Sequence, residues 1–403
     1  MTYTSRISDP PMAMVRGLPK APTVILWGAL LSLPFMAIQI SGLQPAHVWL
    51  VATLFYLLLI RSFTISLTEA CALLFFLGFA GIVTFLQDYP RVKSFDQIIK
   101  FALFYPGFYF AGRWVAQKFA DRPLPLGYAF LLLFLGFQYV TQVLELPVIY
   151  KEHLFGQGTL NGTFRERNWL AVYFLLLSYV ILLKDESRWR FVPFFLINAA
   201  VTLLSGSKTT FVACGIIFLL QARANLGWKV IPMIVGAVFY MTAFADEFSE
   251  EKLNVKFEQE RGLAYEASMK LIGENPVGYG FGFVEAYFGS MTSESILGLG
   301  TGVNAVFSAP IDLYIIAGAG GLVFWAVFFA GVGNQALTVL LPVAALTLLN
   351  PLHQSEIVYF FCGMLTTFGR MRLSKRWTSR RTSQPSISHP VRSGDPNIDL
   401  NKI

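Results

Sequence analysis

The sequence predicts an all-α polytopic integral membrane protein, with about twelve transmembrane helices and one large loop outside. Charged residues form 14% of its 403 residues, against about 25% in soluble proteins. The apolar set AVILMFWYC reaches 55%, and the mean hydropathy is +0.56. These residues come in long blocks, and a helix needs about twenty apolar residues to cross a bilayer. A soluble protein this poor in charge could not cover its own surface, so soluble classes are excluded.

Twelve apolar blocks are the candidate membrane-spanning helices. They cover residues 23–40, 46–60, 67–86, 97–116, 124–144, 168–183, 191–204, 209–221, 230–245, 304–330, 335–350 and 356–369. Only Ser205-Gly206-Ser207-Lys208 separates the seventh block from the eighth. This short gap predicts a tight helical hairpin, and the alternative is one long broken helix.

Lys and Arg residues are concentrated in every second connection, and such loops stay in the cytoplasm. Both termini are therefore expected inside. The chain then divides into a cytoplasmic N-terminus (1–22), nine spans (23–245), one large outer loop (246–303), three spans (304–370) and a disordered basic cytoplasmic tail (371–403). Apolar residues at helical spacing within the loop, ended by Gly273 and Pro276, predict one amphipathic helix there.

The sequence gives little support for a metal, nucleotide or disulfide site. Cys71, Cys214 and Cys362 each lie within an apolar block, and no Cys/His pair has metal-ligand spacing. The run at 205–209 does not match GxxxxGK[ST], and the glycine-rich runs of the outer loop follow no strand. The net charge of +7 reflects the inside cations. We expect no cofactor, no metal ion and no nucleic-acid partner.

The first polar constellation lies in the outer connection before the sixth block. Arg165 and Arg167 stand two residues apart, and the planar fork of a guanidinium suits a phosphate or diphosphate. Asn168 could cap the following helix, whose N-terminus also attracts anions. The alternative is that both arginines snorkel at the membrane interface and pair with Glu166.

The second constellation lies at the tip of the expected hairpin. Lys208 follows Ser205 and Ser207 there. A lysine flanked by hydroxyls can contact a phosphate or a sugar. The alternative is a capping turn with an interfacial lysine.

The third constellation combines Arg261 with the run 275–283 of the outer loop. Tyr279 and Phe281 alternate with glycine in this run. Such rings can form a wall against which sugars pack. Alternatively, they lie at the membrane surface, where aromatic residues are common.

Three residues are candidates for a general base, namely His153, His353 and Asp312. His47 and His389 look incidental. Asp312 is the main charged residue within a block, and the other cores are almost free of charge. Transporters usually carry ionisable residues near the bilayer midplane. The scarcity of such ionisable residues here favours a reaction at the outer mouth of the helix bundle over transport through it.

The order of these motifs resembles the O-antigen ligase and polysaccharide polymerase family. A Gly-Thr-Phe…Asn loop (162–168) opens a helix, Ser-x-Ser-Lys-Thr follows at 205–209, and an Asn-Pro run with alternating glycines follows at 275–282. The best match covers roughly 155 to 325, with the pattern completed from Asp312 to Leu322. Arg167-Asn168 and the Ser-x-Ser-Lys-Thr motif look closest to the exopolysaccharide-type polymerases.

The resemblance implies a bacterial inner-membrane transferase with GT-C-like architecture, working at the periplasmic face. It would polymerise undecaprenyl-diphosphate-linked repeat units into an exopolysaccharide or O-antigen, using a glycan acceptor. By position, Arg167, Lys208 and Arg261 would stabilise the donor diphosphate, with Arg165 and Asn168 as neighbours. Membrane lipids, chain-length regulators and flippases are the expected partners.

This chain also departs from the family pattern. Ligases of the family usually carry a His-Asn pair at the start of the helix after the large loop, where Phe307 and Ser308 stand here, with Asn304 upstream. The usual Arg before the Gly-x-Phe loop is absent, and Thr159 is nearest. These departures favour a polymerase over an O-antigen ligase acting on lipid A-core or protein. A non-enzymatic transporter is the second alternative.

Overall fold

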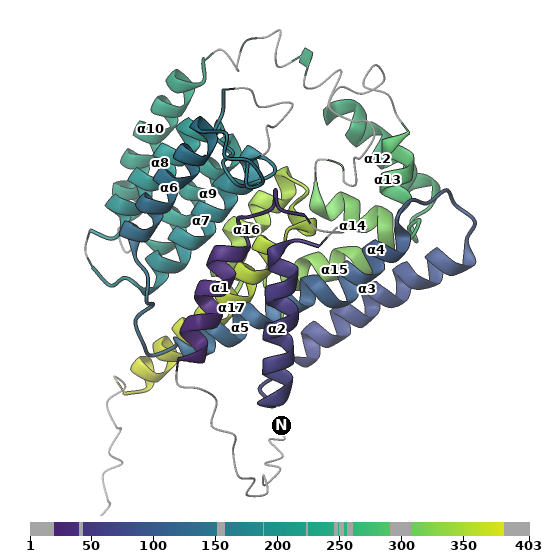
Figure 1. The fold of residues 1–403 in the computed structure, drawn as a ribbon, viewed down its shortest axis with the longest axis horizontal. Coiled ribbons are helices and arrows are strands. Elements are labelled where there is room, and N and C mark those ends of the chain that lie inside the picture. The colour runs from purple at the N-terminus through teal and green to yellow at the C-terminus, as the bar shows by residue number, and fades with distance from the viewer. Residues whose placement is uncertain are drawn as a thin grey trace, which may run out of the picture.

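The structure is a computed structural model, and its described residues are 20–39, 43–150, 158–187, 189–222, 225–245, 249, 254–255, 261–290, 306 and 308–382, with backbone alone for 226 and 372–382. This part of the chain is helical and contains no strand, as the sequence predicts (Figure 1). The helices are α1 (Ala21–Ser32), α2 (Pro45–Leu59), α3 (Leu67–Leu86), α4 (Ser94–Ile99), α5 (Tyr105–Lys118), α6 (Tyr128–Val143), α7 (Arg167–Lys184), α8 (Phe191–Ser205), α9 (Lys208–Gln221), α10 (Leu226–Ala243), α12 (Arg261–Glu274), α13 (Phe283–Gly289), α14 (Ala309–Ala317), α15 (Ala319–Phe328), α16 (Leu337–Leu349) and α17 (Glu356–Thr382). A π-helical segment, Lys100–Phe104, joins α4 to α5, and a short 3-10 helix, Leu352–Gln354, precedes α17.

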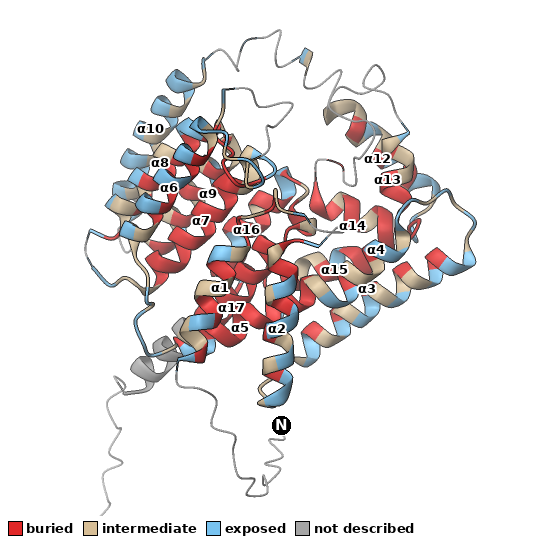
Figure 2. Ribbon diagram, in the orientation of Figure 1, coloured by how far each residue is buried: buried red, intermediate tan, exposed pale blue. Residues whose placement is uncertain are grey.

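The apolar blocks of the sequence correspond to these helices. The block at 67–86 coincides with α3, and a helix, α12, lies where one was expected in the outer loop. By length and composition, α3 and α7 are each able to cross a membrane. Most of the other apolar helices have 10–17 residues. Buried residues fill α5, α7 and α17 at the centre, whereas α3, α6 and α10 present exposed faces outward (Figure 2).

The expected continuous span at 304–330 is wrong. It is divided into α14 and α15, which meet at Gly318 with φ 52°. A Cβ at Gly318 would lie 2.6 Å from the carbonyl oxygen of Pro276, so this close approach requires glycine. A run of apolar residues indicates that a segment avoids water, but it does not reveal a break in the helix at one glycine.

Helices α8 and α9 form the tight hairpin predicted for the seventh and eighth blocks. Gly206 at the turn has φ 66°. The ring of Phe191, at the start of α8, lies 5.2 Å from that of Phe218, near the end of α9. The alternative of one long broken helix is therefore excluded.

The predicted boundary of the C-terminal tail is wrong. Residues 371–382 were expected to be disordered, but α17 continues to Thr382 and extends beyond the bundle (Figure 1). Residues 383–403 lie outside the described residues. Helix α17 packs closely along α5, where Gly112 lies against the backbone of Phe360 and Gly363 against that of Tyr109.

The connections gather at two opposite ends of the bundle, which we call the outer end and the inner end. The outer end holds the connections 87–93, 158–166, 205–208, 275–282 and 350–355. The inner end holds 61–66, 119–127, 185–187, 189–190 and 331–336. At the outer end, for example, Val92 donates a backbone hydrogen bond to Gly282 (3.0 Å). At the inner end, Arg370 donates from Nε to the carbonyl oxygen of Asn334 (2.9 Å). Helix α3 connects the two ends.

Candidate functional site at the outer end

The connection before α7 is fixed to α6 by two glutamine side chains. Gln142 donates from Nε2 to the carbonyl oxygen of Thr159 (2.9 Å) and accepts from the backbone N–H of Asn161 (2.8 Å). Gln138 accepts from the N–H of Thr163 (2.7 Å). The glutamines are four residues apart and therefore share one face of α6. Sequence reasoning missed them, although a pair of amides at this spacing in an apolar helix was a visible signal.

The first and second constellations meet at the outer end. The backbone N–H of Leu160 donates to the carbonyl oxygen of Leu204 (2.8 Å). A Cβ added to Gly206 would lie 3.5 Å from Nη1 of Arg167 and 3.7 Å from the methyl group of Thr159. The guanidinium of Arg167 therefore lies over the hairpin turn.

Two helices begin at this point. Helix α7 starts at Arg167 and α9 starts at Lys208, and neither N-cap side chain, Glu166 or Ser207, accepts a capping hydrogen bond. The first N–H groups of a helix carry partial positive charge and attract anions. The prediction that Asn168 caps α7 is wrong, because the helix begins one residue before it.

The serines of the hairpin turn are buried. Ser205 Oγ accepts from the backbone N–H of Ser207 (3.3 Å), which gives it a structural role in the turn. Ser207 is 1% exposed, and its Oγ has no hydrogen-bond partner in the structure. A buried hydroxyl without a partner is costly, and here it stands beside the start of α9.

The two arginines of the first constellation differ. Arg165 is exposed, whereas Arg167 is partly buried beside the turn. Among the described residues, neither forms an ion pair with Glu166, which removes the pairing suggested in the alternative interpretation. Arg167 is therefore the arginine placed to act together with the turn.

Lys208 and Arg261 reach the same end of the bundle by separate routes. Nζ of Lys208 lies 5.9 Å from the ring centroid of Phe244. Arg261, the first residue of α12, donates from Nη1 to the carbonyl oxygen of Leu349 (3.4 Å).

Helices α9 and α16 show why these two cations share one end. They pack side by side, and at the inner end Nε2 of Gln221 donates to the carbonyl oxygen of Thr338 (3.3 Å). The helices are therefore antiparallel, so Lys208 and Leu349 both lie at the outer end. All three predicted cations are at the outer end, and the structure brings Arg167 to the turn that carries Lys208.

Tyr279 and Phe281 do not form the expected wall for sugars. They are 4% and 1% exposed, respectively. Tyr279 stacks on Phe283 at 4.2 Å and donates its hydroxyl to the carbonyl oxygen of Leu271 (2.8 Å). Phe281 packs edge-on against Phe76. These contacts place both rings in the core, where their faces are already occupied.

The candidate bases Asp312 and His353 lie together but are sealed from solvent. Nδ1 of His353 is 3.8 Å from Oδ2 of Asp312, too long for a hydrogen bond, and the residues are at most 1% exposed. Oδ1 of Asp312 accepts from the N–H of Val306 (2.8 Å). Burial lowers the pKa of His353 to about 3, which keeps its imidazole neutral. His153 lies outside the described residues.

Two buried contacts made by glutamate carboxyl groups were missed from the sequence. Nε2 of His47 lies 3.2 Å from Oε1 of Glu356, so the view of His47 as incidental is wrong. At the inner end, Glu69 is fully buried and pairs with Arg113 and Arg370. The Ser-x-x-Glu spacing of a capping box, starting at Ser66, was the available signal for Glu69.

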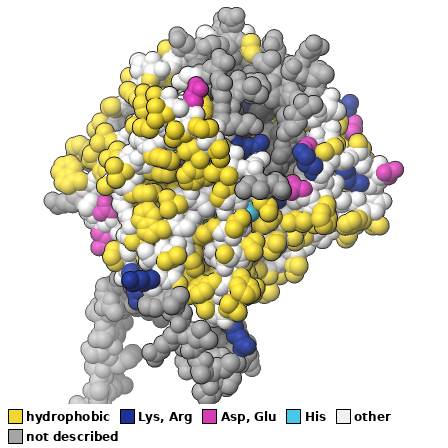
Figure 3. Space-filling model, in the orientation of Figure 1, with side chains coloured by type: hydrophobic (Ala, Val, Ile, Leu, Met, Phe, Trp, Pro, Cys, Tyr) yellow, Lys and Arg dark blue, Asp and Glu magenta, His cyan; other side chains and the backbone are white. Residues whose placement is uncertain are grey.

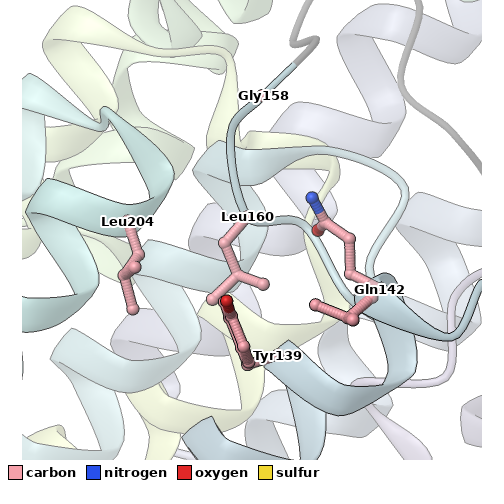
Figure 4. Close-up of a pocket in the computed structure, with 6 residues that line it drawn as sticks. Tyr139, Gln142, Gly158, Leu160 and Leu204 are labelled. Carbon is pink, nitrogen blue, oxygen red and sulfur yellow. The ribbon is translucent and has the colours of Figure 1, made fainter.

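A small pocket of about 80 Å³ lies beside the first constellation (Figure 4). It is lined by Tyr139, Gln142, Val143, Gly158, Leu160 and Leu204. Ligand sites usually have about 300–1,000 Å³, so this pocket alone does not accommodate a sugar substrate.

Within the described residues, no group of three His, Cys, Asp or Glu side chains could hold a metal ion. No protein-family model matches the chain. No curated protein matches it either. The motif order and the geometry of the outer end therefore carry the functional inference.

Proposed function

We propose that this protein is a bacterial inner-membrane glycosyltransferase that polymerises undecaprenyl-diphosphate-linked repeat units into a surface polysaccharide. The reaction would take place at the outer end, on the periplasmic side. One observation carries the proposal: Arg167 lies over the turn that bears Lys208, where α7 and α9 both begin. Cations and helix N-termini at one point suit a diphosphate.

The exterior of the helices supports a location in the membrane. Ile231, Ile234 and Val238 of α10 are exposed, as are Phe85 and Leu86 of α3. Hydrophobic side chains cover much of the face seen in Figure 3. Soluble monomers rarely expose apolar patches of more than a few hundred Å². A bilayer around the helices would cover this surface.

In the proposed arrangement the chain crosses the membrane about twelve times, with both termini in the cytoplasm. The broken pair α14–α15 takes the place of the tenth span. Membrane proteins tolerate such breaks where the exposed backbone is buried in protein. This condition is met at the break after α14. The carbonyl oxygens of Ile315 and Ile316 accept hydrogen bonds from the backbone N–H groups of Tyr279 (2.7 Å) and Gly280 (2.9 Å).

The proposed chemistry is an inverting displacement at the anomeric carbon of the donor sugar. A hydroxyl oxygen of the acceptor glycan forms the new bond, and the bond to the diphosphate oxygen breaks. The lipid diphosphate leaves with the electron pair, and the hydroxyl proton passes to solvent or to a base. Arg167, with Lys208 and Arg261 at the same end, would stabilise the charge that develops on the leaving group.

Asp312 and His353 are not proposed to touch the acceptor, because both are sealed within the bundle. Their burial gives them a part in packing α14 against the connection between α16 and α17. Arg165 and Asn168 remain neighbours of the proposed diphosphate site, without an assigned contact.

The two alternative functions are an O-antigen ligase and a transporter, and different features of the chain bear on each. A ligase of the same fold is less favoured, because Phe307 and Ser308 replace the usual His-Asn pair. A transporter is favoured by the buried carboxyl groups of Glu69 and Asp312, since ionisable groups inside membranes often mark ion pathways. Among the described residues, every partner of the Glu69 carboxylate is a hydrogen-bond donor, which suits a fixed structural ion better than a transport site.

The lipid profile of a deletion strain tests the proposal. Loss of a polymerase should leave single repeat units on the lipid carrier, because export continues while chain growth stops. Loss of a ligase should leave long polymer on the carrier. A strain with neither product would contradict both transferase functions and support the transporter.

The proposed topology can be tested independently of the chemistry. Reporter fusions near residues 160, 207 and 275 should all report the periplasm, because these segments lie at the outer end. A fusion near residue 187, at the inner end, should report the cytoplasm and serves as the control. A cytoplasmic signal at any of the first three positions would remove that segment from the proposed site.

A further inference from the structure

Glu69 lies in the buried cluster at the inner end, and its carboxylate has no remaining capacity to accept hydrogen bonds. Oε2 of Glu69 accepts from the N–H of Ser66 (2.9 Å) and from Arg113. Oε1 accepts from the hydroxyl of Tyr109 (2.9 Å) and lies 3.5 Å from Nη2 of Arg370. A carboxylate offers about four acceptor directions. All of these partners are donors, so Glu69 is ionised and saturated.

The cluster carries more positive charge than Glu69 can balance. Arg113 and Arg370 are both cationic, and the other partner of Arg370 is a neutral residue, Asn334. Arg370 donates from Nε to the Asn334 carbonyl oxygen (2.9 Å) and from Nη2 to Oδ1. Ser66 also donates to that Oδ1 (3.4 Å). One positive charge therefore remains without a countercharge among the described residues.

Two donors of the cluster have no acceptor. Nε of Arg113 and Nδ2 of Asn334 are buried and make no hydrogen bond. The two residues are 6% and 2% exposed. A buried donor without a partner is unfavourable. The cluster thus has a surplus of hydrogen-bond donors and of positive charge, and an anion beside it would supply the missing negative charge.

The cluster is open to such an anion at one residue. The side chain of Arg370 is 31% exposed, whereas those of Glu69 and Arg113 are at most 7% exposed. Arg370 lies where α17 leaves the bundle, at the end that the proposed topology places at the cytoplasmic headgroup layer. Basic sites at this level commonly bind anionic lipid headgroups.

We propose that the Glu69–Arg113–Arg370–Asn334 cluster is a phosphate-binding site, with the Arg370 guanidinium as the contacting group. The ligand chemistry is a phosphate that carries net negative charge. Its source is either the headgroup of an anionic phospholipid or free phosphate. This inference depends on the membrane location but not on the glycan chemistry at the outer end.

The test uses the full-length protein purified in neutral detergent. Thermal unfolding is followed while phosphatidylglycerol, phosphatidylcholine or inorganic phosphate is titrated, at constant ionic strength. Phosphatidylglycerol should raise the midpoint in a saturable way, and phosphatidylcholine should not. In Arg370→Gln, half-saturation should require about tenfold more phosphatidylglycerol, as expected from the loss of one charge-assisted contact. An equal response to inorganic phosphate would identify free phosphate as the ligand.

Two further variants distinguish binding at this cluster from nonspecific attraction of the anionic lipid to a basic surface. Asn334→Asp places an acceptor and a negative charge inside the cluster, so it should lose most of the response to phosphatidylglycerol. Lys118→Gln removes one exposed cation from the same end of the bundle and should keep the wild-type response. The proposal is overturned if Arg370→Gln and Asn334→Asp respond as the wild type does. It is equally overturned if Lys118→Gln loses as much as Arg370→Gln.

Discussion

Replacing Arg167 with alanine is expected to slow polymer formation by about a hundredfold or more, with the protein still at its normal level in the membrane. The guanidinium lies over the hairpin turn, beside the starts of α7 and α9. Removing it takes a donor pair from the point where the leaving diphosphate gains charge. Arg167→Lys should recover only part of the rate, because an ammonium lacks the planar fork. The rate is measured with purified protein and a lipid-linked repeat unit, and chain length is scored in cells.

Arg165→Ala is the matched control for this experiment. It removes the same kind of side chain two residues earlier, from an exposed position. We expect its rate to stay within about threefold of the wild type, as is common for exposed charges. Near-normal polymer from Arg167→Ala would contradict the shared diphosphate site. So would equal losses in both variants, because general electrostatic attraction would then explain the effect.

Much of the helical framework could be predicted because apolar blocks report which segments avoid water. The block at 67–86 matched α3, and the four-residue gap after Leu204 predicted the α8–α9 hairpin. The break at Gly318 was missed because glycine is common in apolar helices, and only the close approach of Pro276 reveals why it is needed. The end of the last helix was also misplaced, because Arg and Lys are good helix formers that composition alone assigns to a tail.

The candidate site was predicted only in part, because sequence does not reveal which polar groups meet. Arg167 and the Ser205–Lys208 turn were both named, and the structure brings them together through Leu160 and Leu204. Tyr279 was assigned to sugar binding because its glycine neighbours suggested an open loop. In the structure those glycines instead let the segment lie close against neighbouring helices. The ion pairs of Glu69 were overlooked because Arg113 and Arg370 lie on distant segments.

Replacing Glu69 with alanine is expected to destabilise the folded protein by about 3–5 kcal/mol. The carboxylate is fully buried and holds Arg113 and Arg370 together with the hydroxyl of Tyr109. Without it, Arg113 would be left as an unpaired charge at the packed interface of α5 and α17. Thermal unfolding of the purified protein measures the effect, and size-exclusion chromatography shows whether the fold persists at low temperature.

Asp96→Ala provides the comparison for Glu69→Ala. Asp96 also pairs with a cation, Lys100, at 2.7 Å, but its side chain is 52% exposed. An exposed pair contributes about 0–1 kcal/mol, because water screens both charges. The difference between the two variants therefore isolates the effect of burial. Similar small losses in both would mean that water reaches Glu69, and would contradict the sealed, saturated carboxylate on which the surplus charge of the inner end depends.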